Sequence, residues 1–280
     1  TPDAQMKTWF SEVPSLVAYS DGSSTRYVRS ADSLELNQMI GKGLLGVVAY
    51  YQGTSVYMPK IDTDDNSVAE TGDPYTAMEH HWDESFGYFG CARDYNDYTD
   101  DSARKSSYDS NSDGSIDYLS EYNFAWATYA AKRDIDCAGT CTSDNDFTGD
   151  IFGAYLAGRT LIHNEGALTA IQLERLKVVN AWEKMVASNV IHYANAVSDK
   201  ITAGNVSIIH AWAEMRAFAM ALQYNSYKII SDSVLSEVIT LMGNAPPAAS
   251  DWTAYQTSLT QILDKLQTAY SFDDANMSAW

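Results

Sequence analysis

The sequence predicts an all-α fold built from antiparallel helical bundles. Apolar residues recur at steps of three and four in most long segments, strand signals are few, and turn residues separate the periodic segments. With 45% apolar and 20% charged residues, the 280-residue chain has the composition of a folded globular protein. A chain of this length forms either one elongated domain or two packed half-domains.

The first two helices are expected before residue 90. Residues 34–51 carry an amphipathic pattern with three glycines, which suggests that a neighbouring helix or a ligand approaches this backbone closely; a break in the helix is the alternative. Residues 71–89 form the second predicted helix. Its expected start has Asp73 as the capping residue and Pro74 in the first turn.

Residues 90–149 are rich in Asp, Ser, Asn and Gly, which predicts a loop-rich insertion with one helical island at 119–133. Approximate half-bundles at 1–135 and 150–280 are therefore expected within a single helical domain. The periodic segments that follow the insertion predict helices at 151–162, 168–197, 206–224, 231–242 and 251–269.

The charge is strongly negative, because 18 basic residues face 37 acidic ones and give a net charge of -19. Such a field repels nucleic acid and anionic lipid and attracts cations, including metal ions. No stretch approaches the roughly 18 apolar residues that a transmembrane helix requires. Thr1 does not begin a signal peptide, so a mature portion of a protein without a transmembrane segment is expected.

Two of the three cysteines lie close together in the sequence Cys137-Ala-Gly-Thr-Cys141. The central glycine allows a tight loop that brings the two Cβ atoms within bridging distance, which predicts a disulfide and an oxidising compartment. Two exposed thiols in a cytosolic loop are the alternative. Cys91 is left over, either as a buried inert thiol or as a partner in a different pairing.

The motif HxWxE occurs twice, at His80-His81-Trp82-Asp83-Glu84 and at His210-Ala211-Trp212-Ala213-Glu214. Repetition suggests that two half-bundles arose by duplication, although so short a match also arises by chance. On a helix, positions four apart share a face, and positions three apart also converge. If the two helices face each other, their His and Glu side chains provide a transition-metal site. The alternative is that each His and Glu form a hydrogen-bonded pair on their own helix. The candidate ligands are His80, His81, Glu84, His210 and Glu214.

A calcium-binding loop of EF-hand type is indicated at residues 109–117. Side-chain oxygens stand at alternate positions, Gly114 permits the sharp turn, and the carbonyl of residue 115 adds a ligand. The loop departs from the pattern at its end, where Ser120 occupies the twelfth position and the acid follows one residue later. This departure allows a shifted ligand, a water ligand or weak affinity, and a solvated acidic turn without an ion is the alternative. The candidate ligands are Asp109, Asn111, Asp113, Ser115, Asp117 and Glu121.

Residues 42–52, 75–90 and 157–159 resemble the bacterial lipoproteins grouped as domain-of-unknown-function family 4856, and the resemblance covers most of the chain. That family is similar to the imelysin-like proteins of iron-uptake systems, whose HxxE marker is matched here by His81 and Glu84. Glu79 stands two residues before the marker histidine, where that pattern has glycine. The resemblance implies a duplicated, imelysin-like helical bundle with a metal-related role. It also implies a periplasmic or outer-membrane-anchored lipoprotein of a Gram-negative bacterium, with a lipid anchor upstream and an outer-membrane uptake receptor as partner.

The leading functional hypothesis is a non-enzymatic envelope protein that binds iron, zinc or a metal complex and is associated with metal uptake, with calcium as a second ion. A metal-dependent peptidase of imelysin type is the first alternative, although the chain has HxxE and HxxxE but no HExxH. A module that binds glycans or another surface ligand is the second alternative. Its support is the 19 Tyr and 7 Trp residues, most of which belong in the core of a helical bundle.

Overall fold

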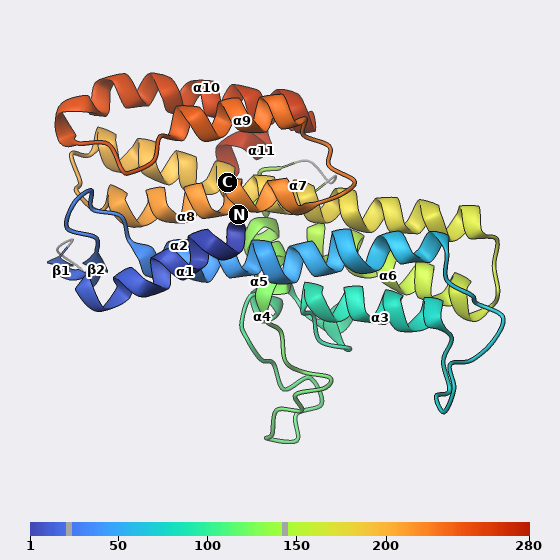
Figure 1. The fold of residues 1–280 in the computed structure, drawn as a ribbon. Helices are drawn as coiled ribbons and strands as arrows, with labels where there is room; N and C mark the ends of the chain where they lie inside the picture. The colour runs from blue at the N-terminus through green and yellow to red at the C-terminus, as the bar shows by residue number, and fades with distance from the viewer. Residues whose placement is uncertain (21–23, 142–144) are drawn as a thin grey trace. The chain divides into compact units, whose positions relative to one another are not determined.

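The computed structural model describes residues 1–20, 24–141 and 145–280 (Figure 1). The described residues form eleven α-helices and one two-stranded antiparallel sheet, which confirms the all-α fold class. They divide into two compact units, each described below by itself. Unit 1 comprises Thr1–Val47, Val186–Gln223 and Ile229–Trp280, and unit 2 comprises Val48–Met185 and Tyr224–Lys228. The boundaries differ from the expected half-bundles at 1–135 and 150–280, because each unit takes segments from both halves of the sequence.

Unit 1 is built around helices whose apolar faces are buried. Helix α2 packs against α8, and α9 packs against α8 and α10. A short hairpin pairs β1 with β2, with Val17 opposite Val28. The elements are α1 (Pro2–Glu12), β1 (Val17–Ser20), β2 (Thr25–Val28), α2 (Leu36–Leu44), the later part of α7 (Leu168–Thr202), α8 (Ile208–Ala221), α9 (Asp232–Met242), α10 (Trp252–Tyr270) and α11 (Asp274–Ala279).

Unit 2 contains the predicted insertion and the first HxWxE motif. Helix α3 packs against α5, α6 and the helical turns Gln52–Tyr57 and Met58–Asp62, and α5 packs against α4 and α6. The segment after α2 continues as π-helical and 3₁₀ turns as far as Asp62, beyond the predicted end at residue 51. The remaining α-helices of the unit are α3 (Ala77–Phe89), α4 (Asp100–Ala103), α5 (Ala125–Cys137), α6 (Phe147–His163) and the earlier part of α7.

An aromatic cluster forms the core of unit 2. The ring of Trp182 lies 5.4 Å from Tyr50 and 5.2 Å from Phe89, centroid to centroid, in edge-on arrangements. Gly53 is required beside this cluster, because a Cβ atom there would lie 2.7 Å from the Trp182 ring. Backbone and indole are therefore in direct contact at this point.

Two aspartates cap the start of α6. Asp146 accepts a hydrogen bond from the backbone N–H of Gly149 at 2.8 Å. Asp134, which extends from α5, accepts the N–H groups of Phe147 and Thr148 at 2.9 and 2.8 Å. The Asp134 side chain is buried, and this burial raises its pKa to about 8. Asp134 thus joins α5 to α6 through a buried carboxyl group whose pKa is raised well above its ordinary value.

We expect the free energy of unfolding to fall as the pH rises from about 4 to about 8. The substitution Asp134→Asn should abolish the part of this fall that comes from Asp134. The folded-state pKa of Asp134 lies above its ordinary value of 3.8, so the folded chain keeps a proton that the unfolded chain releases. The stabilisation from this proton is fully present below the pKa that Asp134 has in the unfolded chain. It is lost as the pH rises through the pKa of the folded state, at up to about 1.4 kcal/mol per pH unit. Urea unfolding at pH 5 and pH 8 measures it. Asp146→Asn keeps an accepted capping residue and should retain most of the slope, because the Asp146 charge makes the smallest contribution to the raised pKa of Asp134. An unchanged pH slope in Asp134→Asn would contradict the assignment.

Candidate metal site

Helix α3 carries the first HxWxE motif, and a capping box defines where the helix begins. Thr76 accepts the N–H of Glu79 at 3.2 Å, and Glu79 in return accepts the N–H of Thr76 at 2.9 Å. The predicted start at Asp73 and Pro74 was wrong, because this reciprocal pair satisfies the first free amides three residues later. The spacing Thr76-x-x-Glu79 was visible in the sequence.

His80 lies between two carboxylates. Its Nδ1 is 2.9 Å from Glu70 Oε2, and its Nε2 is 3.5 Å from Glu84 Oε1. The hydrogen bond to Glu70 raises the pKa of His80, and it favours the tautomer with hydrogen on Nδ1. In that tautomer the lone pair on Nε2 is free to ligate a cation, and Nε2 lies 3.5 Å from a Glu84 oxygen that could ligate the same cation. Imidazole nitrogen and carboxylate oxygen are therefore presented together, one helical turn apart.

His81 has different partners from its neighbour. Its Nδ1 is 2.7 Å from Asp64 Oδ2, and its Nε2 is 2.9 Å from Lys60 Nζ. Both ring nitrogens are thus engaged, while the ring stacks on His80 at 5.3 Å. Of the two histidines, the structure brings His80 to Glu84, so the HxxE spacing of His81 and Glu84 does not correspond to a contact between them.

The second HxWxE motif, on α8, has the same arrangement within unit 1. His210 Nδ1 lies 2.8 Å from Glu35 Oε2, and His210 Nε2 lies 3.4 Å from Glu214 Oε2. Two cations also enter this cluster. Lys42 Nζ is 3.3 Å from Glu214 Oε1, and Arg26 Nη1 is 2.8 Å from His210 Nδ1.

Each motif histidine is thus held at Nδ1 by a carboxylate from outside its helix and faces the motif glutamate with Nε2. Glu70 and Glu35 provide the outside carboxylates, and sequence analysis missed both. Glu35 is 1% exposed, although the glutamate precedes α2 without any motif of its own. The two clusters belong to different units, and the prediction of one site shared between them remains a prediction.

The motif tryptophans are buried in the core, and each indole N–H has an acceptor. Trp82 Nε1 donates to the carbonyl of Tyr155 at 2.9 Å. Trp212 Nε1 donates to the hydroxyl of Tyr255 at 2.7 Å. The motif therefore combines one buried anchor with a His-Glu pair on another face of the helix.

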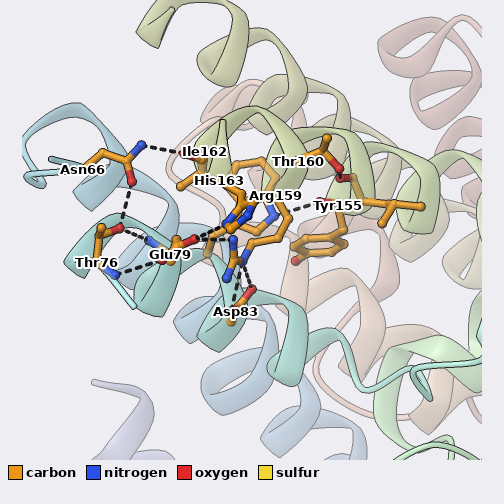
Figure 2. A network of polar contacts seen from close by, with 11 residues as sticks. Asn66, Thr76, Glu79, Asp83, Tyr155, Arg159, Thr160, Ile162 and His163 are labelled. Atoms are coloured by element: carbon orange, nitrogen blue, oxygen red, sulfur yellow. Dashed lines mark hydrogen bonds and ion pairs between the residues drawn. The ribbon is translucent and has the colours of Figure 1, made fainter. Parts of the chain in front are cut away.

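Arg159 of α6 binds two carboxylates of α3 (Figure 2). Its Nε is 2.9 Å from Asp83 Oδ1, and its Nη1 is 2.6 Å from Glu79 Oε1. His163 Nδ1 also approaches Glu79, at 3.2 Å. This network occupies Glu79 and joins α3 to α6, so the glutamate that stands where the imelysin pattern has glycine has a structural role here.

The predicted calcium loop turns its side-chain oxygens toward its own backbone. Asp109 accepts the N–H groups of Asp113 and Gly114 at 3.1 and 2.9 Å, and Asn111 accepts that of Asp113 at 2.9 Å. Asp113 accepts the N–H of Ser115 at 2.8 Å. Gly114 has a φ of +84°, the left-handed conformation that the pattern assigns to glycine at this position.

Glu121 closes the loop at its end. Its carboxylate accepts the N–H groups of Ser110 at 2.8 Å and of Asp117 at 3.0 Å, so one side chain links both ends of the loop. These backbone hydrogen bonds lower the pKa of Glu121. Asp117 itself accepts the N–H of Leu119 and the hydroxyl of Ser120. In Figure 1 the loop, in green, extends away from the helices of unit 2.

Within the described ranges, no group of three or more His, Cys, Asp or Glu side chains is arranged to hold a metal ion. The His80-Glu84 and His210-Glu214 pairs therefore offer two protein ligands each. Any further ligands would come from solvent or from a molecule that already carries the metal.

The predicted disulfide between Cys137 and Cys141 is confirmed, with their Cα atoms 4.8 Å apart. The leftover Cys91 is a buried free thiol, and burial raises its pKa well above the ordinary value. Among the described helices, none combines the length and apolar character that a membrane span needs.

A family model described as "Domain of unknown function (DUF4856)" matches residues 15–273. The chain belongs to this family. The resemblance of residues 42–52, 75–90 and 157–159 to DUF4856 is thereby confirmed, and the match includes both HxWxE helices and the loop at 109–121. Neither the curated proteins nor the solved structures gave a match.

Proposed function

We propose that this DUF4856 protein binds a transition metal, as an ion or as a complex, through His80 and Glu84. In this proposal it serves metal uptake at the bacterial cell envelope without catalysing a reaction. The observation that carries the proposal is the placement of His80 Nε2 at 3.5 Å from Glu84 Oε1, with Nδ1 held by Glu70. A histidine fixed by a carboxylate behind it is the usual support of a metal ligand.

The donor set fits iron and zinc, both of which accept imidazole and carboxylate ligands. His80 and Glu84 are 35% and 41% exposed, so an incoming ion can reach them. Two protein ligands fill only part of the coordination shell of either metal. This incomplete set favours a metal that arrives with a chelating molecule, such as an iron complex, over a bare ion held by the protein alone.

The His210-Glu214 pair is the weaker candidate. Lys42 and Arg26 already compensate its negative charge, and Lys42 contacts the Glu214 carboxylate directly. Within the described residues, no lysine or arginine contacts His80 or Glu84. A metal cation is therefore opposed by fixed positive charge at His210 and not at His80.

Location in the envelope is supported by the Cys137-Cys141 disulfide, which is typical of oxidising compartments. The proposed imelysin-like relationship, the lipid anchor and the uptake receptor depend on the family resemblance. A binding role is favoured over a metallopeptidase because catalytic zinc sites usually have three protein ligands, and each pair here provides two.

We also propose that calcium binds the loop at residues 109–121. The alternating oxygens of Asp109, Asn111 and Asp113 and the left-handed Gly114 support this site. The carbonyl of Ser115 and the carboxylates of Asp117 and Glu121 are the remaining candidates, with Glu121 one residue later than the usual acid.

Calorimetric titration of metal-stripped protein with zinc, and separately with ferric citrate, tests the transition-metal site. We expect one saturable site in the wild type that His80→Ala and Glu84→Gln weaken at least tenfold. Glu70→Gln should weaken it by about tenfold to a hundredfold, because the histidine loses its orienting partner.

His163→Ala is the matched control, since this histidine of unit 2 contacts Glu79 and not Glu84. It should leave binding unchanged, and His210→Ala should have a smaller effect than His80→Ala. If the wild type shows no saturable site beyond calcium, the metal hypothesis is wrong and the His-Glu pairs are structural.

A further inference from the structure

An apolar pocket of about 180 Å³ opens between α3 and α6 in unit 2. Its wall is formed by the rings of Trp82, Phe86, Phe152 and Tyr155 and by the side chain of Leu156. The charged side chains of Asp83, Arg93 and Arg159 complete the lining. For comparison, a dry engineered cavity of about 150 Å³ holds one benzene molecule. The volume therefore suits a single ring with a short substituent.

The pocket is separate from the proposed metal site. Successive helical residues are about 100° apart, so Trp82 and Phe86 lie on the side of α3 opposite His80 and Glu84. Trp82 and Phe86 face α6, where the Phe86 ring is 5.4 Å from Tyr155. Asp83, next to Trp82 on α3, is paired with Arg159 of α6 (Figure 2).

The wall of the pocket is held rigidly. The Trp82 indole is fixed by its hydrogen bond to the Tyr155 carbonyl at 2.9 Å, and the Tyr155 hydroxyl lies 2.9 Å from that of Ser85. Both rings are at most 2% exposed, so they are supported from behind by the core. These two buried rings form a fixed floor under the accessible side chains of Phe86 and Leu156, and a preformed pocket reduces the entropic cost of binding.

The polar groups at the rim favour an anionic ligand over a cationic one. Both oxygens of Asp83 already contact Arg159 Nε, at 2.9 and 3.1 Å. Arg159 Nη2, in contrast, has no hydrogen bond to any residue that the structure describes. Among the described residues, Arg93 forms a hydrogen bond through its Nε alone, with Asp94 at 3.1 Å, and its side chain is 73% exposed. The pocket thus has unused guanidinium N–H groups, while its carboxylate is already paired.

We propose that this pocket binds a small aromatic carboxylate, with its ring against the accessible side chains of Phe86 and Leu156 and its carboxylate at Arg93 and Arg159. Guanidinium groups bind carboxylates with paired hydrogen bonds, and aromatic walls favour a flat ring. The site lies apart from the His80-Glu84 pair, and its ligand is independent of any metal.

Ligand-observed NMR titration with three probes of matched size tests the proposal: phenylacetate, 2-phenylethanol and 2-phenylethylamine. Phenylacetate should bind at least tenfold more tightly than the amine. Arg93→Gln should weaken the binding of phenylacetate about threefold to tenfold and leave the binding of 2-phenylethanol unchanged. Because Arg93 is largely exposed, this substitution removes a charge without disturbing the core.

Two further variants make the test specific. Leu156 is 58% exposed at the rim, so Leu156→Asp places a negative charge there. This charge should weaken the binding of phenylacetate and strengthen the binding of the amine. Arg104→Gln is the control, because Arg104 is paired with Asp101 outside the pocket. The proposal would be overturned if the amine bound more tightly than phenylacetate, or if all three probes bound with equal affinity. It would also be overturned if Arg93→Gln left the affinity for phenylacetate unchanged.

Discussion

Gly158→Ala is expected to destabilise unit 2 by about 3 kcal/mol, the upper part of the range for overpacking a dense core. A Cβ atom at Gly158 would lie 2.0 Å from Trp82 Cζ2 and 2.3 Å from Cη2. The indole is held in place because its Nε1–H donates to the carbonyl of Tyr155, which lies on α6 together with Gly158. The clash therefore has to be relieved by separating α3 from α6.

Gly153→Ala is the matched control on the same helix. A Cβ atom there meets nothing within 4 Å, so the change should stabilise the helix by up to about 1 kcal/mol through helix propensity alone. Urea unfolding of both variants gives the comparison. When Trp82→Phe is added to Gly158→Ala, part of the stability lost in Gly158→Ala should be recovered, because a smaller ring leaves room for the methyl group. Purely additive effects in this double-mutant cycle would contradict a direct contact.

Calcium should stabilise the protein against thermal unfolding, and Asp113→Ala should remove most of this effect. The loop at residues 109–121 is rich in Asp and Ser, which bury little apolar area to offset the entropy of ordering the chain. An ion that binds only the folded loop adds about 2.7 kcal/mol at a hundredfold excess over Kd. Chelation should loosen this loop first.

The substitution is selective, because within the described part of the chain the exposed Asp113 carboxylate accepts one hydrogen bond, from the N–H of Ser115. Stability without calcium should therefore change little. Asp97→Ala, at an exposed position outside the loop, should respond to calcium like the wild type. Differential scanning calorimetry with calcium and with chelator gives the result. Identical responses of Asp113→Ala and the wild type would mean that the loop is an acidic turn without a bound ion.

Features that depend on neighbouring residues were predictable from the sequence. The Cys137-Cys141 bridge, the left-handed Gly114 and most of the long helices are set by spacings within one turn or one loop. Helix α1 was missed although Pro2 is placed at its start, because the helix buries only Trp9 and so has weak apolar periodicity.

Contacts between distant segments could not be predicted in this way. Glu35 and His210 are 175 positions apart, and no local pattern links a buried glutamate to that imidazole. The same holds for Gly158 and Trp82, since a glycine within a helix has several explanations until its neighbour is known. The sequence therefore indicated the candidate histidines and their helical glutamates, and the fold added the carboxylates that orient them.

The burial of Cys91 has a consequence for oxidative folding. Three thiols allow three different pairings, but the closure of a short loop carries the smallest entropic cost, so the bridge between residues four positions apart forms most readily. Once unit 2 has folded, Cys91 is inaccessible and its raised pKa keeps it as the unreactive thiol. Exchange with the finished bridge requires a thiolate, so the native pairing is protected against rearrangement. A folded chain should thus retain one titratable thiol, detectable only after denaturation, and should need no reductant during storage.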